Sequence, residues 1–589
     1  MSRQYLKWLS LLAALTALVS LTLACNPAPT PETIVQKETV VVKETVVVKE
    51  TVEVPVEVTV EVIKEVPAVE SVAPAAMSDQ NLIWSVEGVN EMPGLDPANP
   101  QNAQSVLAMN LIFGGLVKLD AQLNVIPDGA ESWQVSEDGK TYTFTIREGL
   151  KFADGAPATA QDFADSINRA LQPETASYGA SFQLQHVVGA TDVAEGKAET
   201  ATGVKVVDER TLEITTDDTV PYFMAQLTYP VTFAVPLKFI EEQGANWADQ
   251  AYGTGPFRVK EWQHNQKLIL EPNPNYWAGP VGVAQIELPF LQDSETAYQL
   301  YRTGDLDIMG SQQNPVPAAR IPEVNSSPDF NQVAAFAVRY IGFNNQKAPF
   351  DNVNVRRAFA MAVDKSTLAE KILNGSVGPT GRILPPGFPG SQLPVEGLPF
   401  DGEQAQAELE EAGFDASNPL PQVTLTYGAE GDNERVATFL QQQWKDNLGV
   451  DVILEPLELA TFSKNLDTTF LTPEEGLQFY LSIWGADYPD PQNFVSQQLR
   501  SDSPNNNGHW ENAQFDELAK QADTFTGPAE ERFKLYQQAE QIAVDEVGWL
   551  PLFVPRFTVL IKPYVSGVVP TGQGLIVPDW SAVRGRSVQ

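Results

Sequence analysis

The sequence predicts an α/β fold built from several lobes, and three observations carry this prediction. The chain has 589 residues, a length that suggests about three or four lobes, each with its own core. Short runs that alternate apolar and polar residues, such as 141–147 and 267–271, predict strands. Segments 160–171 and 354–373 carry apolar residues at helical spacing, so helices are expected among the strands.

The charge balance excludes one class of partner. The sequence holds 76 acidic and 38 basic side chains, which gives a net charge of -38. A surface this acidic repels phosphate backbones and anionic lipid headgroups. We therefore expect no nucleic-acid partner.

The N-terminus has the features of an export signal. Two basic residues precede an apolar run over residues 8–23, which has the charge and length of a secretory signal. The only cysteine, Cys25, follows this run and cannot form an internal disulfide. Residues 21–25 resemble a bacterial lipobox, with Thr22 where Leu is usual. We expect a signal peptide over residues 1–24 and a lipid on Cys25; the alternative is a free cysteine near an ordinary cleavage site.

Residues 26–77 form a low-complexity segment with almost no aromatic residues. The motif Lys-Glu-Thr-Val occurs three times, beginning at Lys37, Lys43 and Lys49. This six-residue period fits neither a heptad nor an α-helix, and the later alternation of Val with Glu or Thr fits extended chain. We interpret residues 25–78 as a lipid-anchored stalk. Its Val-rich repeats either act as a spacer or pair as strands between neighbouring molecules.

The sequence lacks the usual catalytic and metal-binding motifs. The three histidines, His186, His264 and His509, are scattered, and a single cysteine cannot supply a thiolate cluster. No G-x-S-x-G elbow and no phosphate-binding G-x-x-x-x-G-K-[ST] loop occurs. We therefore expect no enzyme, no cofactor and no metal site. A secreted glycosidase that uses two carboxylates is the remaining enzymatic alternative.

Three stretches agree in order and spacing with one known family. They run from Gly115 to Pro157, from Gly253 to Trp277 and from Gly342 to Asp364. The first contains Ala-Glu-Ser-Trp, Asp-Gly and Asp-Gly-Ala-Pro; the second contains Gly-Thr-Gly-Pro-Phe and Asn-Pro-Asn-Tyr-Trp; the third contains Gly-Phe-Asn and Val-Arg-Arg-Ala. Together they resemble the family 5 extracellular solute-binding proteins, which include the dipeptide- and oligopeptide-binding proteins of bacterial ABC importers.

The resemblance covers most of residues 80–589 and implies a particular architecture. This is a two-lobed α/β fold of the periplasmic-binding-protein type (type II, cluster C-like), with an extra subdomain in the first lobe. Crossover segments join the lobes, which close over the solute. The implied parts are lobe I (79–117, 251–334 and the return segment 556–589), the extra subdomain (118–250) and lobe II (335–555).

The resemblance also implies a ligand-binding loop that starts at Trp484. Asp487 matches the family aspartate that meets the N-terminus of a bound peptide, where a carboxylate pairs with the ammonium group. Trp484 would form a wall of the pocket. Gly485 and Ala486 would offer backbone groups to the main chain of the peptide.

Three further residues are weaker candidates. Phe553 matches a family position near the return crossover that is often aromatic, and a structural role is the alternative. Arg339 and Arg382 are possible partners for a peptide carboxylate, although no motif assigns either role.

The resemblance implies a monomeric, lipid-anchored substrate-binding protein of an ABC transporter. On the outer face of the membrane it would capture short peptides and deliver them to the permease subunits. Two alternatives remain open from the sequence. One is a binder of oligosaccharides or other small solutes with the same fold, and the other is a structural surface protein assembled through the stalk.

Overall fold

The computed structural model describes residues 38–44, 56–62, 80–177, 179–311 and 314–587. The chain separates into two compact units, residues 1–75 and 76–589. In the first unit, β1 (Glu38–Glu44) and β2 (Val56–Val62) pair as an antiparallel ribbon, so two segments of the stalk pair within one chain. The predicted signal peptide, Cys25 and the rest of the stalk lie outside the described residues.

The first lobe of the second unit is organised by a six-stranded sheet. Its strand order is β11-β12-β13-β3-β24, and β4 pairs with β13. The strands are β3 (Gln80–Ile83), β4 (Val86–Glu87), β11 (Phe257–Gln263), β12 (Lys267–Pro272), β13 (Gln285–Leu291) and β24 (Arg586–Ser587). Every second residue of β13 is buried, which is the pattern of a strand with one face on a core. Because β3 and β24 belong to one sheet, the chain leaves this lobe and later returns to it.

A second sheet with a core of its own follows in the sequence. It has the order β7-β8-β10-β9. Its strands are β7 (Ala130–Val135), β8 (Thr141–Ile146), β9 (Val204–Asp208) and β10 (Thr211–Thr215). The predicted hairpin turn between β7 and β8 is confirmed, and Gly139 adopts the positive φ of +71° that favours glycine. We call this sheet and its helices the inserted sheet.

Helix α3 (Ala160–Leu171) packs on the inserted sheet and confirms the predicted helix. It begins at this point because Thr159 and Asp162 cap it: the Thr159 amide donates to Asp162 Oδ2 at 2.7 Å. The neighbouring helices and the small hairpin before the inserted sheet are α2 (Ala103–Ile112), α4 (Ala180–Gln183), α5 (Ala190–Ala194), α6 (Phe223–Gln226), α7 (Leu237–Gln243), β5 (Val117–Leu119) and β6 (Val125–Pro127).

The second lobe is built on a mixed sheet of order β14-β21-β16-β20-β18-β19, with β15 and β17 also paired to β21. Strands β14 and β15 of this sheet lie in the segment predicted for lobe I. The strands are β14 (Ile308–Met309), β15 (Phe330–Ala334), β16 (Ala337–Phe343), β17 (Val377–Pro379), β18 (Val423–Gly428), β19 (Val452–Leu457), β20 (Phe479–Gly485) and β21 (Trp549–Ile561). Strands β19, β18 and β20 run parallel, whereas β16 is antiparallel to β20. The carboxyl ends of β18 and β20 therefore lie at the same edge.

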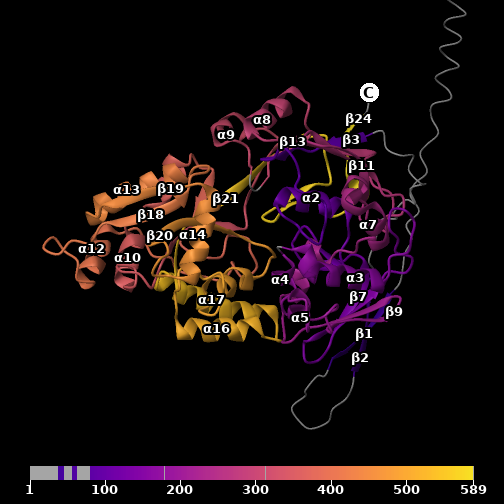
Figure 1. Cartoon of the computed structure of the whole chain (residues 1–589), viewed down its shortest axis with the longest axis horizontal. Helices are drawn as coiled ribbons and strands as arrows, with labels where there is room; N and C mark the ends of the chain where they lie inside the picture. Colours follow the sequence, from indigo (N-terminus) through magenta and orange to yellow (C-terminus); the bar gives the residue numbers. More distant parts are fainter. Residues whose placement is uncertain (1–37, 45–55, 63–79, 178, 312–313, 588–589) are drawn as a thin grey trace, which may run out of the picture. The chain divides into compact units, whose positions relative to one another are not determined.

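Strand β21 connects the two lobes. Its first half, including Leu550 and Leu552, is buried in the core of the second lobe. Farther along, Phe557 and Val559 are buried in the core of the first lobe. Figure 1 shows this strand, in yellow, running from the orange sheet towards the purple part of the molecule. Such a strand can act as a crossover between lobes.

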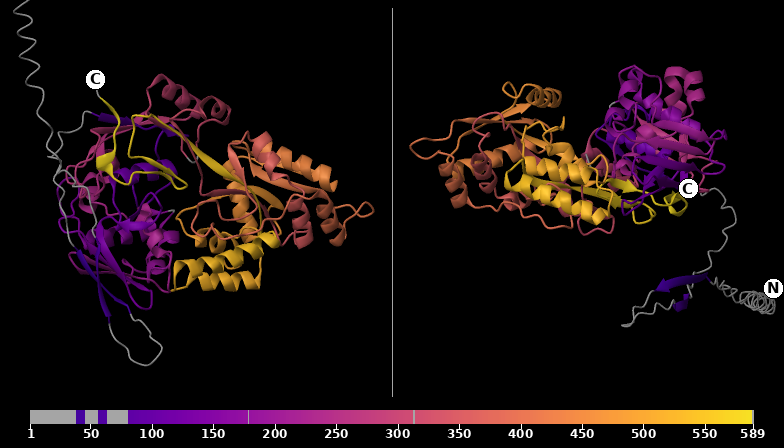
Figure 2. Two further views of the ribbon diagram at one scale, coloured as in Figure 1. Left: turned by 180° about the vertical axis from the view of Figure 1, so that it is seen from behind. Right: turned by 90° about the horizontal axis from the view of Figure 1, so that it is seen from below.

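Helices cover the sheet of the second lobe, and α16 and α17 lie side by side, as Figures 1 and 2 show. The remaining helices are α8 (Ser294–Thr303), α9 (Ile321–Val324), α10 (Val353–Met361), α11 (Lys365–Thr367), α12 (Gly402–Glu411), α13 (Asn433–Leu448), α14 (Leu459–Leu471), α15 (Val495–Leu499), α16 (Ala513–Asp523) and α17 (Ala529–Asp545), and the short strands β22 (Val569–Thr571) and β23 (Gly574–Ile576) pair near the C-terminus. No helix of the described residues is long and apolar enough to span a bilayer.

The helix predicted over 354–373 is wrong in one respect, because it is not continuous. Helix α10 ends at Met361, and a new helical segment begins at Lys365. The cause is Asp364, whose Oδ1 accepts a hydrogen bond from the Thr367 amide at 3.0 Å. An aspartate that caps a new helix favours a break in the preceding one.

Candidate functional site

The candidate site is the loop that follows β20 at the carboxyl end of this strand. Trp484 is half-buried, and its indole Nε1 donates to the carbonyl of Asn493 at 2.8 Å. This bond joins the end of the strand to the far end of the loop. The loop therefore returns on itself beside the sheet edge, where parallel strands often place ligand sites.

Asp487 is the central residue of this loop. Its amide donates to Asn493 Oδ1 at 3.0 Å, and Asn493 Nδ2 donates to Asp487 Oδ2 over a long 3.4 Å. No cationic side chain in the described parts of the chain forms an ion pair with its carboxylate. Burial raises the pKa of Asp487 to about 6. Asp487 is thus partly buried, and its carboxylate lacks a positive partner.

The other half of the loop is fixed to the helices of the second lobe. The carboxylate of Asp490 forms a buried ion pair with Arg532 of α17 and also accepts from the Gln492 amide at 3.0 Å. Tyr488 lies between the two acids, is 1% exposed, and belongs to the core of the inserted sheet. The loop is therefore held by the core of the inserted sheet through Tyr488 and by α17 of the second lobe through Asp490. Asp487 directly precedes these two contacts in the chain.

The backbone groups predicted to meet a peptide differ in their availability. Gly485 is the last residue of β20 and is exposed. The Ala486 amide already donates to the carbonyl of Phe336 at 2.8 Å, and its carbonyl accepts from Gln573 Nε2 at 3.0 Å. The exposed strand end at Gly485 is consequently more open to a new backbone partner than Ala486.

Phe553 lies apart from the loop, on the first half of β21. It is 6% exposed and packs in the core of the second lobe. The ladder pairs Phe553 with Arg339, and Arg339 in turn with Ile483 of β20. Four of the predicted ligand-binding residues are therefore brought together in the loop, and Phe553 is two strands away from β20.

The structure separates the two candidate arginines. Arg382 Nη2 donates to Glu540 Oε2 at 2.7 Å, and Arg382 Nη1 donates to the carbonyls of Ser391 and Leu393 at 2.7 and 2.9 Å. Arg382 is thus committed to an internal pair. The guanidinium of Arg339, by contrast, makes no hydrogen bond with any residue that the structure describes, and its Nε is buried.

Sequence reasoning missed two structural partners of the loop. Asn493 bonds to both Asp487 and Trp484, and Arg532 binds Asp490 from more than forty positions away. Asn493 could have been suspected, because an amide inside the same loop commonly fixes a turn. Arg532 carried no signal, since its pairing depends on how α17 packs.

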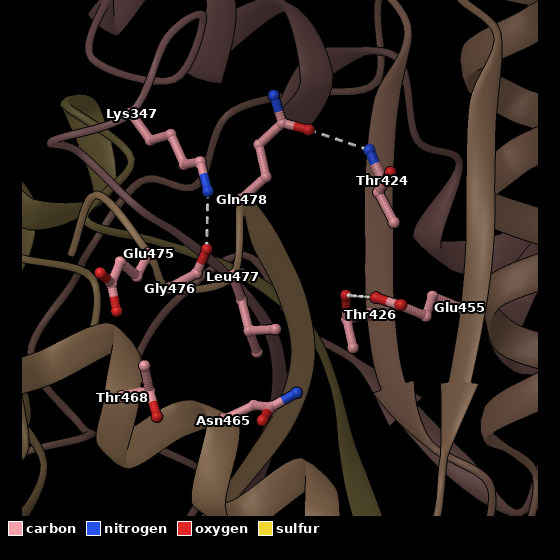
Figure 3. Close-up of a pocket in the computed structure, with 10 residues that line it drawn as sticks. All are labelled: Lys347, Thr424, Thr426, Glu455, Asn465, Thr468, Glu475, Gly476, Leu477 and Gln478. Atoms are coloured by element: carbon pink, nitrogen blue, oxygen red, sulfur yellow. Dashed lines mark hydrogen bonds between the residues drawn. The ribbon is translucent and has the colours of Figure 1, made fainter. Parts of the chain in front are cut away.

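A polar pocket of about 450 Å³ lies elsewhere in the second lobe, beside β18 and α14 (Figure 3). Its polar groups bond to one another: Lys347 Nζ donates to the carbonyl of Gly476 at 2.7 Å, and Thr426 Oγ1 donates to Glu455 Oε2 at 2.8 Å. None of the predicted ligand-binding residues lines this pocket. It is therefore separate from the Asp487 loop.

Two lobes joined by a long crossover strand, with a partly buried acid in a loop at a sheet edge, are the architecture of a solute-binding protein. Residues 124–506 match the family model of the bacterial extracellular solute-binding proteins, family 5. The chain belongs to this family. This match confirms the predicted resemblance. The proteins of this family are not enzymes, which confirms the prediction that this chain is not an enzyme.

Curated relatives match over nearly their whole length. The probable deoxycholate-binding periplasmic protein YgiS of Escherichia coli is 36% identical over 490 residues, which cover 81% of this chain and 88% of YgiS. The periplasmic oligopeptide-binding protein OppA of Salmonella typhimurium is 33% identical over 518 residues, which cover 85% and 92%. These relatives agree in family and differ in the solute that their names state.

A solved structure gives the same result for the fold. The unliganded open form of MppA, the murein tripeptide-binding protein of Escherichia coli, matches with a TM-score of 0.72 at 28% identity. The match covers 85% of this chain and 96% of MppA. The predicted two-lobed type II fold is confirmed.

Proposed function

We propose that this protein is a lipid-anchored substrate-binding protein that captures short peptides for an ABC importer. Cys25 carries the anchor, residues 25–78 form the stalk, and the protein works as a monomer on the outer face of the membrane. The ligand binds between the lobes, and a membrane permease receives the closed form. No ATP chemistry is required of this chain.

One observation carries the peptide assignment: the carboxylate of Asp487, a partly buried residue, has no cationic partner among the described residues. Burying a carboxylate without a partner is unfavourable, and an incoming ammonium group would supply the missing charge. The α-ammonium of a peptide has this charge, whereas a neutral oligosaccharide does not. The names of relatives such as OppA, which binds oligopeptides, support the same solute class.

The proposed lobe boundaries follow the predicted ones: 79–117, 251–334 and 556–589 for lobe I, 118–250 for the extra subdomain, and 335–555 for lobe II. The burial of β21 supports the last boundary, because residues up to Phe553 pack in the second-lobe core and Phe557 packs in the first. Closure of the lobes would then pivot near residues 554–556.

Titration calorimetry with trialanine and N-acetyl-trialanine tests the role of Asp487. The free peptide should bind the wild-type protein roughly tenfold to a hundredfold more tightly, because acetylation removes the charge that Asp487 meets. Asp487→Asn should abolish this difference. Asp467→Asn, which changes an exposed carboxylate on α14, is the matched control and should preserve it. Equal affinities for both peptides in the wild-type protein would contradict the proposal.

A second candidate solute is an apolar carboxylate, which the name of YgiS favours. Such a ligand carries no ammonium group, so its affinity would not depend on an ionised Asp487. Binding of deoxycholate that persists in Asp487→Asn, with no binding of trialanine, would favour this alternative.

A further inference from the structure

Arg339 is a basic residue without a partner at the edge of the sheet where the candidate loop begins. It lies on β16, directly opposite Ile483 of β20. Its guanidinium forms neither a hydrogen bond nor an ion pair with a described residue, and its Nε is buried. Because desolvation without compensation is costly for a cation, an unpaired guanidinium in this position requires an explanation.

Nearby acids do not satisfy it. Glu430 and Asp432 follow β18 and attract the charge of Arg339 from a distance, but neither forms an ion pair with it. The side chain of Glu430 instead lies against Gly428, and Asp432 pairs with Arg435 at 2.7 Å. Burial lowers the pKa of Arg339 from its ordinary value, because removal from water disfavours the charged form.

Arg339 lies at the end of the sheet where the candidate loop begins. Tyr427 of β18 pairs with Leu481 of β20, and Arg339 pairs with Ile483, two residues farther along β20. Arg339 therefore lies level with the residues that follow β18. The opposite residue, Ile483, is an exposed apolar side chain with 41% of its surface accessible. This end of the sheet is therefore reachable from solvent, at the carboxyl ends of two parallel strands.

We infer that Arg339 is a second anchor of the binding site, which pairs with a carboxylate of the ligand. This inference rests on the proposed function and adds an anionic group to the ligand. A planar guanidinium suits such a group because two of its N–H groups can bind both carboxylate oxygens.

The chain between the two anchors limits the ligand. Ile483 and Asp487 are four residues apart, which corresponds to at most roughly 13 Å of extended backbone. An extended peptide of about three or four residues covers this span. The carboxylate is thus either the C-terminus of a short peptide or the side chain of an acidic residue close to its N-terminus.

The test compares the wild-type protein with Arg339→Gln and Arg339→Lys by titration calorimetry. The probes are trialanine, trialanine amide, Ala-Asp-Ala amide and its Ala-Asn-Ala counterpart, and deoxycholate. Arg435→Gln removes a nearby exposed arginine of the same lobe and is the matched control. Thermal unfolding of each variant checks the fold, which Arg339→Gln should preserve because no hydrogen bond is lost.

Arg339→Gln should weaken binding of a carboxylate-bearing probe roughly tenfold to a hundredfold and leave its amide counterpart unchanged. Arg339→Lys should restore part of the loss, and Arg435→Gln should have no effect. A loss confined to trialanine identifies the C-terminal carboxylate, and a loss confined to Ala-Asp-Ala amide identifies the acidic side chain.

The outcomes separate this inference from the proposed function. Equal losses for charged and amidated probes, or no loss at all, would overturn the role of Arg339 while the ammonium dependence of Asp487 stands. Arg339-dependent binding of deoxycholate alone would retain the carboxylate anchor and overturn the peptide assignment. If no probe binds to the wild-type protein, both fail.

Discussion

Tyr222 and Tyr488 stack with their ring planes 3° apart and their centroids 6.0 Å apart. Tyr222 belongs to the inserted sheet, whereas Tyr488 directly follows Asp487 in the loop of the second lobe. Phe182 also stacks on Tyr488, with ring centroids 6.3 Å apart and ring planes 26° apart. An aromatic side chain of the loop is therefore buried in the core of a different part of the molecule, so the position of Asp487 depends on that core.

Replacing Tyr488 with alanine should destabilise the protein and weaken peptide binding together. Removing a buried aromatic side chain typically costs about 3 to 5 kcal/mol in the free energy of unfolding. Urea-induced unfolding measures this loss, and calorimetry with trialanine measures the binding. Tyr488→Phe keeps the ring and loses only the hydroxyl that donates to Gln492, so it should cost about 1 kcal/mol and bind normally. Normal binding by Tyr488→Ala would show that the stacking does not position Asp487.

Peptide affinity should depend on pH in a way that the pKa of Asp487 sets. Its carboxylate must be ionised to pair with an ammonium group, so affinity should fall as pH falls below about 6. The α-amino group of a free peptide loses its proton near pH 8, so affinity should also fall above this value. Calorimetry from about pH 4.5 to about pH 9 should therefore show the highest affinity at roughly pH 6 to 8, between the pKa of Asp487 and that of the peptide amino group. A flat profile for trialanine, indistinguishable from that of Asp487→Asn, would contradict this prediction.

Glu540→Gln should destabilise the second lobe. Glu540 is fully buried and accepts hydrogen bonds from Arg382 and from the amides of Ile383 and Leu384 at 2.8 and 2.9 Å. Removing the negative charge leaves the partly buried guanidinium of Arg382 with only the carbonyls of Ser391 and Leu393, and breaking such a pair costs up to about 3 kcal/mol. Chemical denaturation of Glu540→Gln beside Arg339→Gln measures the contrast, because the second variant breaks no ion pair. A similar stability for both variants would mean that the Arg382 pair contributes little.

The sequence predicts local structure well where one short stretch contains the whole cause. Thr159 and Asp162 cap α3 from within one turn, and Gly139 closes its hairpin with a conformation that glycine favours. The continuous helix over 354–373 fails because apolar spacing alone does not reveal that Asp364 caps a new helix. Periodicity reports which face is buried, and it is insensitive to such a break.

Contacts between distant segments could not be predicted. The sequence gives no reason to distinguish Arg339 from Arg382 as a ligand contact. The packing of α17 places Glu540 against Arg382 and forms an ion pair, whereas Arg339 has no such partner among the described residues. The loop around Asp487 was located through a resemblance to a family. The burial that raises its pKa depends on neighbours that the sequence does not order.

Glu87 should make the stability of the first lobe depend on pH. It is 1% exposed on β4, its Oε1 accepts from the Gly310 amide at 2.8 Å, and its Oε2 has no partner among the described residues. Burial raises the pKa of Glu87 from 4.5 to about 7. Between these values the folded state retains a proton that the unfolded state has released. Raising the pH through this window therefore favours unfolding, by a total on the order of 3 kcal/mol.

Glu87→Gln cannot ionise and should lack this contribution. Its free energy of unfolding, measured with urea at several pH values, should rise relative to that of the wild-type protein as pH increases from 4.5 to 7, the window set by the pKa of Glu87. The difference should then remain constant at higher pH. Asp487→Asn provides the comparison, because its own window lies lower, between 3.8 and about 6. Parallel stability curves for Glu87→Gln and wild type would mean that Glu87 stays ionised in the folded state, with a cation or water at Oε2.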